Sequence, residues 1–200
     1  MAKLVNWHSF EEKMKGKRLY LFNRLDVRRV LGVSPVAATF LLYRYAKKGY
    51  IIRVKPGLYT FPDTPSVPSL YIANKLYEPS YVSLQFALSY HRVIPETVYE
   101  ITSITTKATQ RFQTLGKTFS YRRIKRSAFT GYVSVGQRGF TFLIADPEKA
   151  FVDLTYLRIL KNKKPLDRFD KSKINRSKAL RYAKLFENSK LTSVIKTTLR

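Results

Sequence analysis

The chain has 200 residues, of which 44% are hydrophobic and 14% aromatic, so it holds enough apolar material for one large core or two small ones. It carries 38 Lys and Arg against 13 Asp and Glu, a formal charge of +25, and a compact fold tolerates such self-repulsion best beside a polyanion. Nucleic acid is therefore the leading partner, while the absence of cysteine excludes disulfides, thiolate metal sites and cysteine nucleophiles.

The positive charge is concentrated at the two ends of the chain. Residues 1–62 carry 13 basic and 3 acidic side chains, and residues 161–200 carry the same numbers. No stretch approaches the ~20 apolar residues that a membrane span needs, and the N-terminus has no long apolar run. We therefore expect a cytoplasmic protein without a membrane partner.

The first thirty residues predict two short helices and a strand. Residues 7–15 form a helix capped by Asn6, and the apolar run 19–22 is read as a short strand or the start of a helix. Asn23 is the expected N-cap of a helix over residues 24–31.

The following helix is marked at both ends. Ser34 and Pro35 form an N-cap and first-turn pair, and Gly49 closes the helix after residue 48. Helical spacing places one apolar stripe toward a core, made of Ala38, Leu41, Leu42 and Tyr45. The remaining aromatic and basic side chains point elsewhere and need a partner.

A hairpin comes next. Two apolar segments, residues 50–54 and 58–61, flank the turn residues Pro56 and Gly57. Helix, tight turn, second helix and basic hairpin follow one another in the order of a winged helix-turn-helix. In such a domain the N-terminal part of the second helix enters the major groove and the hairpin lies near phosphates.

Ten residues of this segment are candidate DNA contacts: Ser34, Ala37, Thr39, Phe40, Tyr43, Arg44, Lys47, Lys48, Arg53 and Lys55. Ser34, Ala37 and Thr39 have short side chains and are expected to approach base edges. Tyr43, Arg44 and Lys47 are expected to contact phosphates. Because winged helices also serve as protein-docking modules, the alternative is that Phe40 and Tyr43 belong to a protein interface.

A proline-rich segment at residues 63–68 is the expected linker between a DNA-binding domain of residues 1–62 and an α+β domain of residues 69–200. The second domain is expected to hold a mostly antiparallel sheet with flanking helices. Its expected strands cover residues 96–106, 117–124, 132–135 and 139–145. Its expected helices cover residues 69–77 and 80–91, a segment opened by Asp146, and the basic segments 175–187 and 191–199.

Few groups of residues in the sequence could form a catalytic site. The chain has two histidines, His8 and His91, and no HExxH or phosphate-binding glycine loop. Asp146, Glu148 and Asp153 are the group of residues most similar to the converging carboxylates of a metal-dependent nuclease. However, Asp146 precedes a proline, which favours a helix cap, and Glu148 then complements the helix dipole. We therefore expect a protein without enzymatic activity, cofactor or metal.

Three segments together resemble the AbiEi family of antitoxins. They are GYIIRVKPGLY at residues 49–59, PSYVSLQFAL at residues 79–88 and ADPEKAFVDL at residues 145–154. The resemblance implies a bifunctional protein of a type IV toxin–antitoxin, or abortive-infection, pair. Its winged helix would repress its own operon by binding inverted repeats of operator duplex DNA. Its C-terminal domain would oppose a nucleotidyltransferase-like toxin without a stable complex.

Two other functions remain open at this point. One is a winged-helix-guided nuclease that uses the three carboxylates described above. The other is an RNA-binding module that recognises structured RNA through its basic C-terminal helices.

Overall fold

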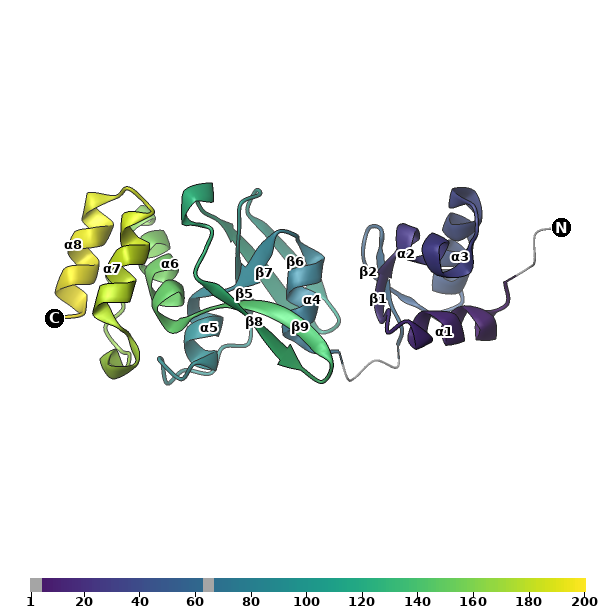
Figure 1. The fold of residues 1–200 in the computed structure, drawn as a ribbon, viewed down its shortest axis with the longest axis horizontal. Helices are drawn as coiled ribbons and strands as arrows, with labels where there is room; N and C mark the ends of the chain where they lie inside the picture. Colours follow the sequence, from purple (N-terminus) through teal and green to yellow (C-terminus); the bar gives the residue numbers. More distant parts are fainter. Residues whose placement is uncertain (1–4, 63–66) are drawn as a thin grey trace. The chain divides into compact units, whose positions relative to one another are not determined.

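The computed structural model describes residues 5–62 and 67–200. The chain divides into two compact units, Met1–Val67 and Pro68–Arg200, called unit 1 and unit 2 below and drawn in Figure 1. The expected linker falls largely on residues 63–66, which lie outside the described residues. Both units combine helices with strands, so the α+β class is confirmed. No helix in the described ranges is long and apolar enough to cross a membrane.

Unit 1 consists of three helices and a three-stranded antiparallel sheet. Its elements are α1 (Trp7–Gly16), β1 (Leu21–Asn23), α2 (Arg24–Leu31), α3 (Pro35–Lys47), β2 (Ile52–Lys55) and β3 (Leu58–Thr60). The strand order is β1-β3-β2, so the hairpin of β2 and β3 is extended by the early strand β1. Gly57, at φ 79°, supplies the left-handed residue of the hairpin turn.

The helix boundaries of unit 1 follow from local hydrogen bonds. Asn23 caps α2 and exchanges a capping box with Asp26, whose carboxylate accepts from the Asn23 backbone N–H at 2.9 Å. The hydroxyl of Ser34 accepts from the backbone N–H of Ala37 at 3.2 Å, which fixes the first turn of α3 as predicted. Gly49 follows the last turn at φ 73°.

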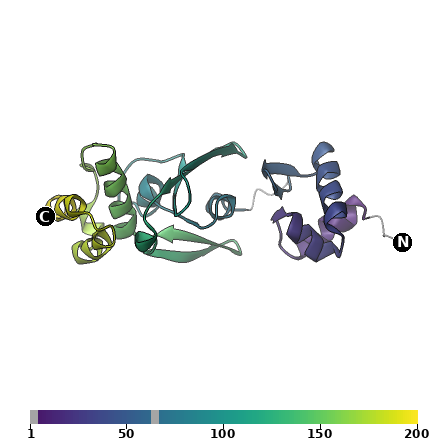
Figure 2. The same cartoon turned by 90° about the horizontal axis from the view of Figure 1, so that it is seen from above.

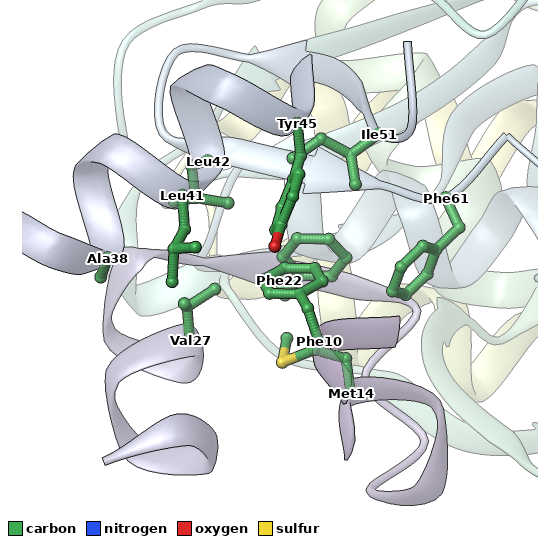
Figure 3. Close-up of a cluster of buried hydrophobic side chains, with 10 residues drawn as sticks. All are labelled: Phe10, Met14, Phe22, Val27, Ala38, Leu41, Leu42, Tyr45, Ile51 and Phe61. Atoms are coloured by element: carbon green, nitrogen blue, oxygen red, sulfur yellow. The ribbon is translucent and has the colours of Figure 1, made fainter. Parts of the chain in front are cut away.

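The core of unit 1 gathers side chains from the three helices, from β1 and from the two ends of the hairpin. Its buried members are Phe10, Met14, Phe22, Val27, Ala38, Leu41, Leu42, Tyr45, Ile51 and Phe61. Figure 3 shows Leu41 pointing toward Val27 and Tyr45 toward the rings of Phe10 and Phe22. The ring centroids of Phe10 and Tyr45 lie 4.9 Å apart in an edge-on contact. The inner stripe of α3 is therefore confirmed, and it fixes how this helix is rotated.

Unit 2 is built on a six-stranded sheet. Its strands are β4 (Ser80–Val82), β5 (Ile101–Thr105), β6 (Gln110–Thr114), β7 (Lys117–Arg123), β8 (Tyr132–Gln137) and β9 (Phe140–Ala145), in the order β6-β7-β5-β4-β9-β8. The pairs β4–β9 and β5–β7 are parallel and the other three neighbouring pairs are antiparallel. The sheet is therefore mixed, with only a narrow majority of antiparallel pairs.

The helices of unit 2 pack on this sheet and on one another. They are α4 (Ser69–Leu76), α5 (Leu84–Tyr90), α6 (Pro147–Leu160), α7 (Arg176–Lys184) and α8 (Ser189–Thr198), with short 3-10 turns at Arg126–Ala128 and Lys171–Lys173. Figures 1 and 2 show α6, α7 and α8 side by side at one end of unit 2, and these three helices contact one another.

One predicted helix is wrong in its first turn. Residues 80–91 were expected to form a single helix, but Ser80–Val82 is the strand β4, and α5 begins only at Leu84. All three residues of β4 are buried between β5 and β9, so the strand lacks the alternation that marks a half-exposed strand.

Candidate nucleic-acid interface

The surface of α3 that faces away from the core is apolar. Val36, Phe40 and Tyr43 retain exposed fractions of 64%, 68% and 65%, although side chains of these types are usually covered. Their spacing of i, i+4 and i+7 places them in one stripe on the side opposite Ala38, and Lys47 continues that stripe by one turn. We call these four residues the outer stripe.

The first turn of α3 carries the three small side chains predicted to approach base edges. Ser34 is exposed but its hydroxyl accepts a cap hydrogen bond, and Thr39 donates its hydroxyl to the carbonyl of Pro35 at 3.0 Å. Ala37 is half-buried on the flank of the helix. Of these three, Ser34 and Thr39 therefore lie on open surface with their hydroxyl oxygens directed along the helix.

Arg44 has an intramolecular role that its position in the sequence did not reveal. One guanidinium nitrogen, Nη2, donates to the backbone carbonyl of Val5 and to the hydroxyl of Tyr45, both at 3.1 Å. The Tyr45 hydroxyl donates to the same Val5 carbonyl at 2.9 Å. Arg44 thus ties the start of α1 to α3, and its loss would affect this junction as well as surface charge.

Exposed cations lie at the C-terminal end of α3 and in the hairpin. Lys47 and Lys48 at the end of α3 and Arg53 in β2 are exposed, and none of the three forms an ion pair within residues 5–62. Lys55 is half-buried near the hairpin turn. Residues 34–61 contain no Asp or Glu, so no carboxylate of α3 or the hairpin itself offsets this charge.

The ten candidate contacts lie on α3, its two cap residues and β2, and Val36 of the outer stripe is not among them. The sequence alone places Val36 on the same helix face as Phe40 and Tyr43, because it lies four residues before Phe40 and seven before Tyr43. This face is opposite the core stripe. A valine in the first helical turn carries no charge or hydrogen-bonding group, so a search for polar contacts passed over it.

Asp146 and Glu148 share Lys178 as a partner, whereas Asp153 takes part in a separate network. Asp146 caps α6 by accepting from the backbone N–H of Lys149 at 2.8 Å, as predicted. The same carboxylate accepts from the Tyr182 hydroxyl at 2.6 Å and pairs with Lys178 at 3.0 Å. This cap therefore also attaches α7 to the start of α6.

Glu148 makes a second attachment to α7. Its carboxylate accepts from the backbone N–H of Asn175 at 3.0 Å and pairs with Lys178 at 3.0 Å. Burial alone raises the pKa of Glu148, but the hydrogen bonds from Asn175 and Lys178 outweigh it and hold the pKa below its ordinary value. Glu148 is consequently ionised and engaged at neutral pH.

Asp153 lies fully buried and takes part in a different network. Its carboxylate accepts from the hydroxyls of Tyr81 at 2.9 Å and Ser83 at 2.8 Å, and it forms an ion pair with the fully buried ammonium of Lys149. Burial, strengthened by the neighbouring carboxylate, raises the pKa of the Tyr81 phenol well above its ordinary value. Within residues 5–62 and 67–200, no group of three or more His, Asp or Glu side chains could hold a metal ion.

Comparison with known families gives a match within unit 1. Residues 16–62 match the family described as "Transcriptional regulator, AbiEi antitoxin". This match confirms the resemblance to AbiEi antitoxins over a segment that runs from the end of α1 through β3 and contains the whole outer stripe. A search of curated proteins gave no match.

Breaking the buried pair of Lys149 and Asp153 on one side is expected to destabilise unit 2. Lys149→Met leaves the Asp153 carboxylate buried without its cation and should lower the free energy of unfolding by about 3–5 kcal/mol. Adding Asp153→Leu should restore only part of that loss, because no unpaired charge then stays buried but the hydroxyls of Tyr81 and Ser83 lose their acceptor. Urea denaturation followed by far-UV circular dichroism measures both effects.

Arg111→Met is the matched control, because Arg111 pairs with Glu100 on the surface, where an ion pair contributes less than about 1 kcal/mol. Equal, small losses for Lys149→Met and Arg111→Met would contradict the role assigned to the buried pair.

Proposed function

We propose that unit 1 is a winged helix-turn-helix that binds operator duplex DNA and represses transcription of the chain's own operon. In this proposal α2 and α3 form the helix-turn-helix, α3 lies in the major groove, and the hairpin of β2 and β3 is the wing beside the phosphates. The observation that carries the proposal is the family match at residues 16–62 over a surface that combines an exposed helix face with unpaired cations.

The distribution of charge supports DNA over an acidic protein surface as the main partner. Lys47 and Lys48 lie at the C-terminal end of α3 and Arg53 lies in β2, and all three are exposed and available to phosphates. Such contacts release counterions, so they supply affinity that depends steeply on salt. In this proposal the apolar members of the outer stripe lie where base edges are read.

The second part of the proposal concerns antitoxin activity. The AbiEi resemblance extends into unit 2 through PSYVSLQFAL and ADPEKAFVDL, which here form β4 with the start of α5 and the start of α6. We assign unit 2 the task of opposing a nucleotidyltransferase-like toxin without a stable complex. Unit 2 has its own buried core and its own polar network, which suits a separate task.

DNA binding by the full chain should show high affinity for the duplex upstream of its gene and a steep salt dependence. Lys47→Ala and Arg53→Ala should each reduce the magnitude of the slope of log K against log salt by about 1. Fluorescence anisotropy at several salt concentrations measures this slope.

Lys17→Ala is the matched control, because Lys17 is an exposed cation at the C-terminal end of α1, outside α3 and the hairpin. An equal reduction in slope for Lys17→Ala, or equal affinity for upstream and random DNA at physiological salt, would remove the operator-binding proposal.

Repression and protection should separate genetically. The double variant Lys47→Ala with Arg53→Ala changes two exposed side chains and spares the core, so operator binding should weaken without loss of folding. Arg44 is left unchanged because it holds the carbonyl of Val5. Expressed with the toxin from a foreign promoter, the double variant should still rescue growth. Failure of this folded variant to rescue would show that protection requires the DNA-binding surface.

A further inference from the structure

The three apolar members of the outer stripe are unusual side chains for a helix that is to read DNA. Val36 and Phe40 have no hydrogen-bonding atoms beyond the backbone, and both are more than 60% exposed. They cannot recognise the donors and acceptors of guanine, cytosine or adenine edges. The one apolar group that a base pair presents in the major groove is the C5 methyl of thymine.

The length of the outer stripe matches a few base-pair steps of a DNA major groove. From Val36 to Tyr43 the helix rises about 10 Å, which is close to three base-pair steps. Lys47 extends the stripe by one turn and Arg53 lies in the neighbouring hairpin, so cations are available for the phosphates at its margin. An apolar centre with a basic margin complements a methyl-rich groove between two phosphate backbones.

A protein partner is the competing occupant of this face. Phe40 and Tyr43 also border a groove of about 840 Å³ between α1 and α3. If the same face of a second copy covered the stripe, however, Lys47 and Arg53 would find no carboxylate there, because residues 34–61 contain no Asp or Glu. Charge complementarity therefore favours a polyanion as the occupant.

From this arrangement we infer that Val36 and Phe40 read thymine methyl groups in the major groove, so that the chain selects operators with thymines at defined A·T steps. This inference rests on the proposed operator binding and adds the class of base that α3 recognises. Tyr43 and Lys47 continue the same stripe toward the backbone, where a hydroxyl and an ammonium can contact phosphate.

Exchange of thymine for uracil tests the inference, because uracil keeps every hydrogen-bonding group of thymine and loses only the methyl. The probe is the DNA duplex upstream of the gene, prepared once with thymine and once with deoxyuridine, and the full chain is titrated against each. The uracil duplex should bind more weakly by about fourfold for each contacted methyl, the factor that corresponds to burying one methyl-sized group.

Two variants locate the effect on the protein. Val36→Ala with Phe40→Ala should bind the two duplexes with equal affinity, whereas Lys47→Ala should weaken both by the same factor and keep their ratio. Because Val36 and Phe40 are exposed, the fold should survive, and circular dichroism checks this. Phe40→Leu, which keeps an apolar side chain, should retain part of the preference for thymine.

The outcomes separate the inference from the proposed function. Equal affinity of the unchanged chain for thymine and uracil duplexes, with preference for upstream over random DNA intact, would overturn methyl recognition alone. A preference for thymine that survives in the Val36→Ala, Phe40→Ala variant would also overturn it. No preference for upstream DNA at all would refute the proposed function. A change of oligomeric state in Phe40→Ala, with the thymine preference unchanged, would assign the stripe to protein association.

Discussion

The surface that α3 presents to solvent depends on the packing of its opposite face. Ala38, Leu41, Leu42 and Tyr45 are buried in the core of unit 1, so the rotation of α3 about its own axis is fixed. A helix fixed in this way must hold the residues of its opposite face in solvent unless a partner covers them. Arg44 strengthens the constraint by joining α3 to the carbonyl of Val5. The exposure of the outer stripe is therefore a consequence of core packing. The types of side chain in the stripe then indicate which ligand it contacts.

In unit 2 the acidic residues serve as internal connections. Asp153 joins α6 to Tyr81 in the middle of β4 and to Ser83 just after the strand, and Lys149 supplies the countercharge within the same helix. Asp146 and Glu148, one turn earlier, attach α7 through Lys178. The three carboxylates that resemble a nuclease cluster in the sequence are thus all engaged by donors of the chain, two of them by Lys178.

The sequence predicted those elements whose ends carry local chemistry. Asn23 and Asp146 are caps in the structure, and Ser34 with Pro35 opens α3, because a cap depends only on neighbouring backbone groups. The sequence did not predict β4, because its buried residues show no alternation of polar and apolar side chains. It also did not predict β6, because the mostly polar segment Gln110–Thr114 is typical of a loop and becomes a strand by pairing with β7. The role of Arg44 could not be predicted, since its partner Val5 lies 39 residues away. The α3 candidates were placed correctly on one helix, yet Val36 required attention to the apolar side of the pattern.

Site-specific crosslinking tests most directly whether the outer stripe lies in the major groove. The chain contains no cysteine, so Phe40→Cys provides a single thiol for a photoactivatable crosslinker, and Glu12→Cys on α1 provides an exposed control. In the complex with upstream duplex DNA, the account predicts crosslinks from position 40 to bases at discrete positions and none from position 12. Tight DNA binding with crosslinks from position 12 and none from position 40 would contradict the placement of the outer stripe in the major groove.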